Sequence, residues 1–86
     1  MKVLFYGSIL DYTFGENSLE VRDAQCMRTL IDLLGERFGA HFKEFLLADD
    51  TCLFLVNGNG IMTTGGLNTP LCSDDTVEVL PFVEGG

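Results

Sequence analysis

Three short runs of this chain would be apolar on both faces of an extended backbone. They cover residues 2–9, 52–56 and 76–82. In the first run Val3 and Phe5 point to one side, whereas Leu4 points to the other. A strand of this kind is stable inside a sheet, with neighbours along both edges and apolar contacts on both faces. The sequence therefore predicts a sheet with buried central strands.

One long amphipathic helix is predicted between the second strand and the middle of the chain. Asp23 is expected to be its N-cap, and Gly39 lies where a glycine ends a helix. Apolar residues recur between them at helical spacing, forming one stripe. The stripe consists of Met27, Leu30, Ile31, Leu34 and Phe38. A shorter apolar pattern over residues 41–48 predicts one or two further helical turns.

The remaining segments predict shorter strands and turns. Residues 16–22 alternate between apolar and polar side chains, which indicates a second strand in a hairpin with the first. Asn57 and Gly58 form a strong tight-turn pair at the end of the middle strand. Residues 61–62 are then expected to form a short edge strand, and residues 63–70 an extended loop.

The last strand, residues 76–82, has two different faces. Val77 and Val79 share one face, which we assign to the core under the helix. Leu80 and Phe82 share the other face. If nothing covers that face, these side chains form an exposed apolar patch, which is a signal for a binding site. The alternative is that a second layer or the long loop covers them.

The order of these elements predicts an α+β fold in a single domain of residues 1–86. One mixed sheet packs on one main helix, and the order of strands and helices fits a β-grasp. Eighty-six residues can bury only about 60–65% of the surface of the unfolded chain. A dense core is therefore required, and a content of 47% hydrophobic residues can supply it.

Charge and cysteine content narrow the functional classes. Thirteen acidic and five basic residues give a net charge of −8, which argues against binding to nucleic acid or anionic membranes. No transmembrane segment or signal peptide is recognisable, so we expect a cytoplasmic protein. Cys26, Cys52 and Cys72 are widely spaced, which suits a reducing compartment and a packing role. With His41 as the single histidine, we predict no metal site and no catalytic dyad, and His41 itself is expected at the surface or at a helix start.

The chain ends in two glycines after the last strand, within a tail of residues 83–86. A terminal carboxylate on Gly86 has no side chain beside it to hinder attack, and Gly85 lets the backbone lie extended in a narrow channel. These properties suit a carboxylate that partner enzymes activate or conjugate. A frayed chain end is the simpler alternative.

Four sequence motifs occur together along the whole chain. They are Val3-Leu4-Phe5-Tyr6, Val56-Asn57-Gly58, Leu71-x-x-Asp74-Asp75-x-Val77-x-Val79 and Pro81-x-Val83-x-Gly85-Gly86. In this order and spacing they resemble the ubiquitin-like sulfur carriers of the MoaD/ThiS type. The resemblance is strongest to the small subunit of molybdopterin synthase and next to the sulfur carrier of the thiamine pathway. The family's tails often have two consecutive prolines where this chain has Pro81-Phe82.

The resemblance implies a carrier that is not an enzyme in its own right. An E1-like adenylyltransferase would use ATP to activate the carboxylate of Gly86, which Gly85 helps to present. A sulfur donor protein would then convert it to a thiocarboxylate, and the large subunit of molybdopterin synthase would use that sulfur to build molybdopterin. The residues expected to bind these partners are Leu80, Pro81, Phe82 and Val83. The chain itself is expected to bind no metal or cofactor.

Several alternatives share the same features. The chain could supply sulfur for thiamine or another metabolite, although its length and the second helical segment at residues 41–48 favour the molybdopterin type. It could be a ubiquitin-like modifier that forms an isopeptide bond through Gly86. In a different class, it would be a non-catalytic β-grasp interaction module that ends in glycines by chance.

Overall fold

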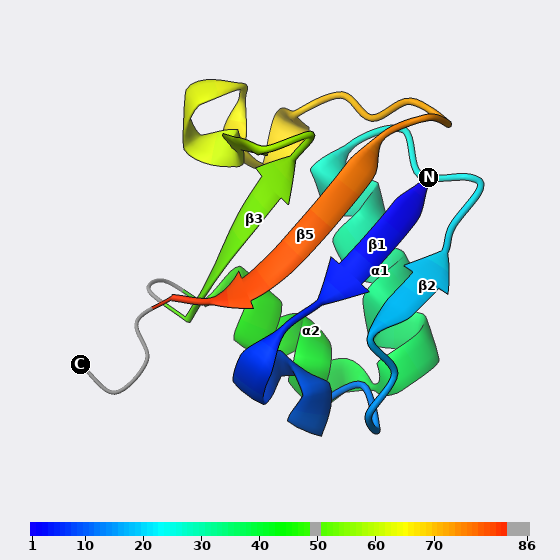
Figure 1. Ribbon diagram of the computed structural model, residues 1–86, viewed down its shortest axis with the longest axis vertical. Coiled ribbons are helices and arrows are strands. Elements are labelled where there is room, and N and C mark those ends of the chain that lie inside the picture. The colour runs from blue at the N-terminus through cyan, green and yellow to red at the C-terminus, as the bar shows by residue number, and fades with distance from the viewer. Residues whose placement is uncertain (49–50, 83–86) are drawn as a thin grey trace.

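The computed structural model describes residues 1–48 and 51–82, which form a mixed sheet with two helices against it (Figure 1). The strands are β1 (Lys2–Phe5), β2 (Ser18–Glu20), β3 (Cys52–Val56), β4 (Asn59–Gly60) and β5 (Thr76–Pro81). The helices are α1 (Met27–Phe38) and α2 (Ala40–Leu47). Three short 3-10 helices lie between strands: η1 (Gly7–Asp11) follows β1, and η2 (Ile61–Thr63) and η3 (Gly66–Asn68) lie between β4 and β5. The predicted α+β class is therefore confirmed.

The last strand of the chain lies in the middle of the sheet, whose order is β2-β1-β5-β3-β4. β5 runs parallel to β1, with Val77 opposite Val3, and antiparallel to β3, with Val79 opposite Phe54. β1 and β2 form the predicted antiparallel hairpin. β5 therefore has hydrogen-bonded neighbours on both edges, as its apolar composition requires.

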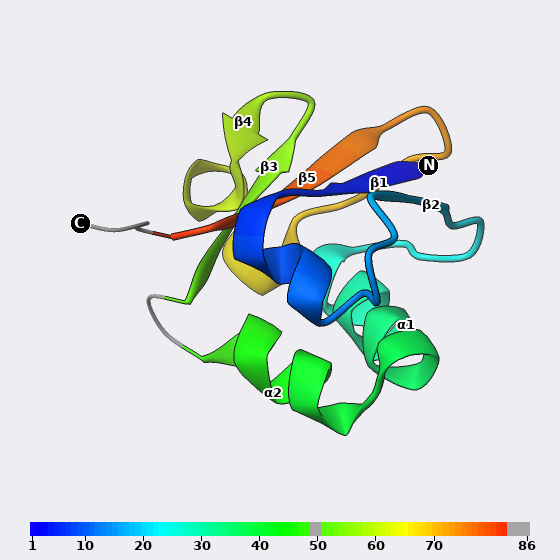
Figure 2. The ribbon, with the colours of Figure 1, turned by 60° about the horizontal axis from the view of Figure 1, so that its bottom comes forward.

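Both helices cover the same face of the sheet, as Figure 2 shows. The predicted stripe of α1 is confirmed, because all five of its residues are buried. Phe5 of β1 meets Phe38 and Phe42 of the two helices in edge-to-face contacts, with ring centroids 5.8 Å and 6.2 Å away. Val77 and Val79 are fully buried beneath the helices, as the alternation predicts. The core thus lies entirely on one side of β5.

The predicted N-cap at Asp23 is wrong, since α1 begins at Met27 with Cys26 as its N-cap. No side chain caps the helix. The amide of Met27 instead donates to the carbonyl oxygen of Thr69 at 3.0 Å, and Cys26 forms an isolated bridge with Pro70. This pairing with a distant segment holds the chain extended until residue 26, and it supplies an acceptor that a cap would otherwise provide.

Three other segments also differ from the predictions, one in its end point and two in the type of structure. β1 ends at Phe5, because Gly7 has a φ of +57° and starts a 3-10 turn that buries Ile9 in the core. Residues 61–62 form no edge strand, since Ile61 turns into the core at the start of η2 and β4 is the edge strand instead. Residues 63–70 contain short 3-10 turns where an extended loop was predicted. The first two differences arise because Ile9 and Ile61 turn into the core and are buried there.

The Asn57-Gly58 turn and the Asp75 turn form one clamp at the end of the sheet where β5 begins. Asn57 and Gly58 have positive φ angles of 52° and 86°, which confirms the predicted tight turn. The Asn57 side-chain amide donates to Asp75 Oδ1 at 2.8 Å, and its Oδ1 accepts from the amide of Thr76 at 3.0 Å. The amide of Cys72 donates to Asp75 Oδ2 at 2.8 Å. Two of the sequence motifs therefore have a structural role.

Replacing Asp75 by alanine should lower the free energy of unfolding at neutral pH by about 1–2 kcal/mol, because two donors lose their acceptor. The amide of Cys72 and the side chain of Asn57 lower the pKa of Asp75 below its ordinary value. A carboxylate of this kind stabilises the fold above the pKa that it has in the unfolded chain, and the stabilisation is lost as the pH falls through its folded pKa.

Urea unfolding at several pH values tests this prediction. The difference between wild type and Asp75→Ala should be largest at neutral pH and shrink below about pH 4. The exposed neighbour Asp74 gives a control, since Asp74→Ala should change stability by less than about 0.5 kcal/mol. Equal effects of the two substitutions would contradict the clamp.

Candidate functional site

The face of the sheet opposite the helices carries four leucines on its three central strands, β1, β5 and β3. Leu53 of β3 lies directly opposite Leu80 of β5, and Leu55 lies opposite Glu78. On the other side of β5, Leu4 of β1 lies opposite Glu78. The helices cover the other face, so these side chains stay partly accessible; Leu53 keeps 40% of its surface exposed. We call this surface, made of the five residues named here, the open face.

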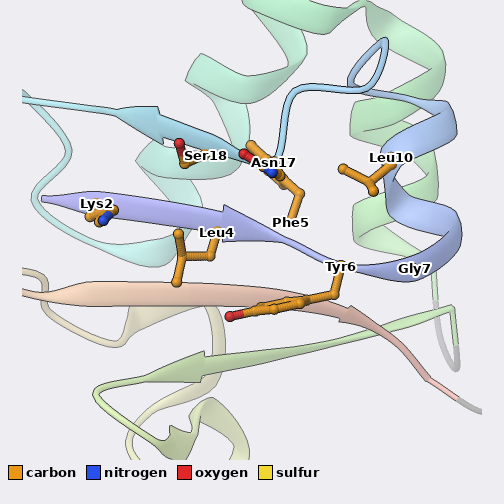
Figure 3. Close-up of a pocket in the computed structure, with 8 residues that line it drawn as sticks. All are labelled: Lys2, Leu4, Phe5, Tyr6, Gly7, Leu10, Asn17 and Ser18. Carbon is orange, nitrogen blue, oxygen red and sulfur yellow. The ribbon is translucent and has the colours of Figure 1, made fainter.

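A hydrogen-bonded pair marks the centre of the open face. The Tyr6 hydroxyl donates to Glu78 Oε2 at 2.9 Å, and its ring lies across β5 in Figure 3. This bond to the carboxylate raises the pKa of Tyr6 above its ordinary value. Beside the pair, Leu4 and Tyr6 line a shallow pocket of 470 Å³ that reaches Leu10 and Ser18 (Figure 3). The pair fixes a polar point within an apolar surface.

The base of the C-terminal tail is held firmly in the sheet. The amide of Phe82 donates to the carbonyl oxygen of Thr51 at 3.2 Å, and Pro81 pairs with Cys52. Thr51 is itself tied to the end of α2, because its hydroxyl donates to the carbonyl oxygens of Phe45 and Ala48. The backbone hydrogen bonds of the sheet therefore extend to Phe82, the last residue that the structure describes.

The predicted site residues divide into two groups. Leu80 and Pro81 are half-buried at the end of β5, and Phe82 keeps 41% of its surface exposed. Val83, Gly85 and Gly86 lie outside the described residues. The structure thus places the base of the tail beside the open face, and the partner-binding roles of these residues stay predictions.

Two residues of the candidate site, Thr51 and Leu53, could not be identified from the sequence. Thr51 precedes β3, and its hydrogen bonds to α2 depend on a contact that the sequence pattern does not reveal. Leu53 sits inside a run that is apolar on both faces, so its own position does not show which face is open. The register between β3 and β5 is needed to place it opposite Leu80.

The structure shows no metal-binding arrangement around the cysteines and the histidine in its described residues. Within residues 1–48 and 51–82, no group of three or more His, Cys, Asp or Glu side chains has a metal-binding arrangement. Burial raises the pKa of the Cys52 thiol, which makes it a poor nucleophile beside the tail. Cys72 is exposed, so the predicted packing role is wrong for this residue. His41 is exposed near the start of α2, as predicted.

Among the described residues, neither helix has the length and apolar composition needed to cross a membrane.

Comparison with known proteins places this geometry in a class. The fold is that of the β-grasp, ubiquitin-like proteins, which confirms the predicted fold. The ThiS family matches residues 3–86, so the chain belongs to the ThiS family, in agreement with its resemblance to MoaD/ThiS-type carriers. A search of curated proteins finds no match.

Three solved structures illustrate the range of relatives. The chain is 32% identical to a chain in the complex of subunits 1 and 2 of molybdopterin-converting factor from Helicobacter pylori 26695, with a TM-score of 0.67 and coverage of 99% of this chain and 96% of that one. It is 24% identical to a chain of the BexX/CysO complex from Amycolatopsis orientalis, with a TM-score of 0.82 and coverage of 99% and 98%. It is 23% identical to small archaeal modifier protein 1 from Methanosarcina acetivorans, with a TM-score of 0.79 and coverage of 99% and 94%.

Aspartate substitutions on the two faces of β5 should lower the free energy of unfolding by very different amounts. Leu80→Asp should lower the free energy of unfolding by about 1 kcal/mol or less, because the new carboxylate stays in contact with water. Val79→Asp should cost about 3 kcal/mol or more, because it places a charge in the fully buried core. Thermal and urea unfolding of both variants measure the difference. Collapse of the fold in Leu80→Asp would show that Leu80 belongs to a core.

Proposed function

We propose that this chain is a sulfur carrier whose C-terminal Gly86 carboxylate is adenylated and then converted to a thiocarboxylate. The sulfur is used to build molybdopterin, the organic part of the molybdenum or tungsten cofactor. The protein acts with an E1-like adenylyltransferase, a sulfur donor protein and the large subunit of molybdopterin synthase. It works in the cytoplasm and performs no catalysis by itself.

One observation carries this proposal: the ThiS-family match runs from residue 3 to Gly86, and the central strand β5 of this domain finishes at Pro81, five residues before Gly86. Residues 83–86 span at most about 13–14 Å. A narrow tail of that length lets Gly86 reach a recessed active site while the domain rests against its surface. Gly85 and Gly86 keep the end of the tail free of side chains.

The chemistry needs one displacement at the α-phosphorus of ATP, one displacement at the carbonyl carbon of Gly86, and a reduction. The carboxylate first attacks the α-phosphorus of ATP, which releases pyrophosphate and forms an acyl adenylate. A persulfide on the donor protein then attacks the carbonyl carbon and displaces AMP. A thiol reduces the resulting acyl disulfide, which leaves the thiocarboxylate on the carrier. ATP is therefore a substrate of the activating enzyme, and the carrier needs no bound cofactor.

The molybdopterin assignment rests on the relative of highest sequence identity among the three structures described above. That relative comes from a complex of molybdopterin-converting factor, at 32% identity over nearly the full length of both chains. The CysO and archaeal modifier structures, at 24% and 23%, support the fold only. Sulfur transfer to thiamine or another metabolite and conjugation to proteins through Gly86 are the competing functions.

Intact-protein mass spectrometry tests the carrier function. The chain is incubated with the adenylyltransferase of its own organism, ATP, Mg²⁺ and sodium sulfide, in which hydrosulfide displaces AMP directly. The mass should rise by the difference between one sulfur and one oxygen atom, and fragmentation should place the change on Gly86. A reaction without ATP serves as the blank.

Two variants provide the controls. Removing Gly86, or adding one residue after it, should abolish the mass change while the free energy of unfolding stays within about 0.5 kcal/mol of wild type. An unchanged mass of the wild-type chain with an active enzyme would contradict the carrier function. Adducts of high mass in cells, linked to lysine through Gly86, would favour the modifier.

A further inference from the structure

A groove at one edge of the sheet gathers most of the exposed apolar side chains that the structure describes. Six large hydrophobic residues in the described ranges are clearly exposed, and four of these line this one groove. The four are Leu47, Leu53, Met62 and Phe82. The groove has a volume of 580 Å³, and we call it the edge groove. Apolar exposure concentrated in this way on a small domain indicates a binding site.

The edge groove exists because β4 is very short. β4 pairs with β3 only at Leu55 and Val56, so the first half of β3 has no neighbour from β4 on its outer edge. The end of α2 and the 3-10 helix η2 flank this part of β3, and Figure 2 shows both segments on that side of the sheet. Phe54 and Ile61 line the groove as buried side chains, each 7% exposed. The floor is thus part of the core and the rim is open to solvent.

The charge distribution indicates what kind of segment would fit there. All five Lys and Arg residues lie within residues 1–43, whereas residues 44–86 contain seven acidic residues and no basic one. Every residue that lines the groove comes from this second half, and none of them is charged. Asp49 and Asp50 follow Ala48 of the lining in sequence, and Glu84 follows Phe82 by two residues. An apolar binding segment with basic flanks is therefore complementary to the groove.

The groove is continuous with the base of the tail, because Phe82 belongs to both. Gly86 can lie no more than about 13–14 Å beyond Phe82. An enzyme that takes Gly86 into its active site must therefore come close to the groove. Because the groove adjoins the base of the tail, we take the partner to be the enzyme that first binds the tail, the proposed adenylating enzyme.

We propose that the edge groove binds an apolar side chain, flanked by Lys or Arg, on the adenylating enzyme that takes the tail; this inference rests on the proposed function. Met62 is the main contact. Its side chain is 86% exposed, so its burial by a partner gains apolar contact that the free domain lacks. An unbranched thioether also adapts to different partner shapes. The groove thereby sets affinity for the enzyme, while Gly86 undergoes the reaction.

Steady-state kinetics of ATP-dependent pyrophosphate release tests the groove, with the full chain as the varied substrate and sodium sulfide present to displace AMP in each turnover. Met62→Lys should raise KM about tenfold, because it removes an apolar contact and repels a basic segment. Met62→Glu should raise KM less, since its charge attracts the same segment. Both variants should leave kcat within about twofold of wild type, because Gly86 is unchanged.

Phe14 gives the matched control, since it is 79% exposed and packs beside Phe38, away from the groove. Phe14→Lys changes the net charge as Met62→Lys does, and its KM should stay within about twofold of wild type. Equal KM values for wild type and Met62→Lys would overturn the groove inference and leave the carrier function standing. Absence of pyrophosphate release with the wild-type chain would contradict the carrier function and this inference together.

Discussion

The structure depends on β5 holding the middle of the sheet. Its hydrogen bonds to β1 on one edge and to β3 on the other fix its position, and the buried Val77 and Val79 attach it to the helical layer. Because β5 is also the last strand among the described residues, the segment that precedes the tail is hydrogen-bonded along both of its edges.

The two ends of β5 have different roles. At its start, the Asn57 and Asp75 side chains close two turns against each other. At its end, Leu80 belongs to the open face and Phe82 lines the edge groove, and Thr51 links Phe82 to α2 through hydrogen bonds. The two turns thus close the start of β5, whereas accessible apolar surface lies at its end. The proposed function uses this separation, because partners can reach the tail without disturbing the turns.

The sequence pattern predicted those features that a periodic burial pattern determines. The helix stripe from Met27 to Phe38, the buried pair Val77 and Val79, and the Asn57 turn each depend on local spacing or local backbone chemistry, and all three are confirmed. The wrong helix start at Asp23 has a non-local cause. Thr69 supplies the acceptor for the first turn of α1 across more than forty residues, and no local signal marks that contact.

The edge groove was missed for a related reason. The sequence pattern places Ile61 and Met62 in an edge strand, whereas the burial of Ile61 in the core turns the chain into a 3-10 helix and leaves Met62 in solvent. The short β4 and the exposed Leu47 contribute to the same groove only in the folded chain. This groove is built from five separate segments and depends on tertiary contacts, which periodicity within one segment cannot reveal.

We expect the proposed partners to approach the end of the sheet where β5 finishes. Amide hydrogen exchange of the chain, alone and saturated with the proposed adenylating enzyme, tests this expectation. Exchange should be slower at residues 51–54 and 61–63 and at Leu80 and Phe82, with no change at Asn57 and residues 72–76. Protection confined to the Asn57 and Asp75 turns, with the tail end unaffected, would contradict it.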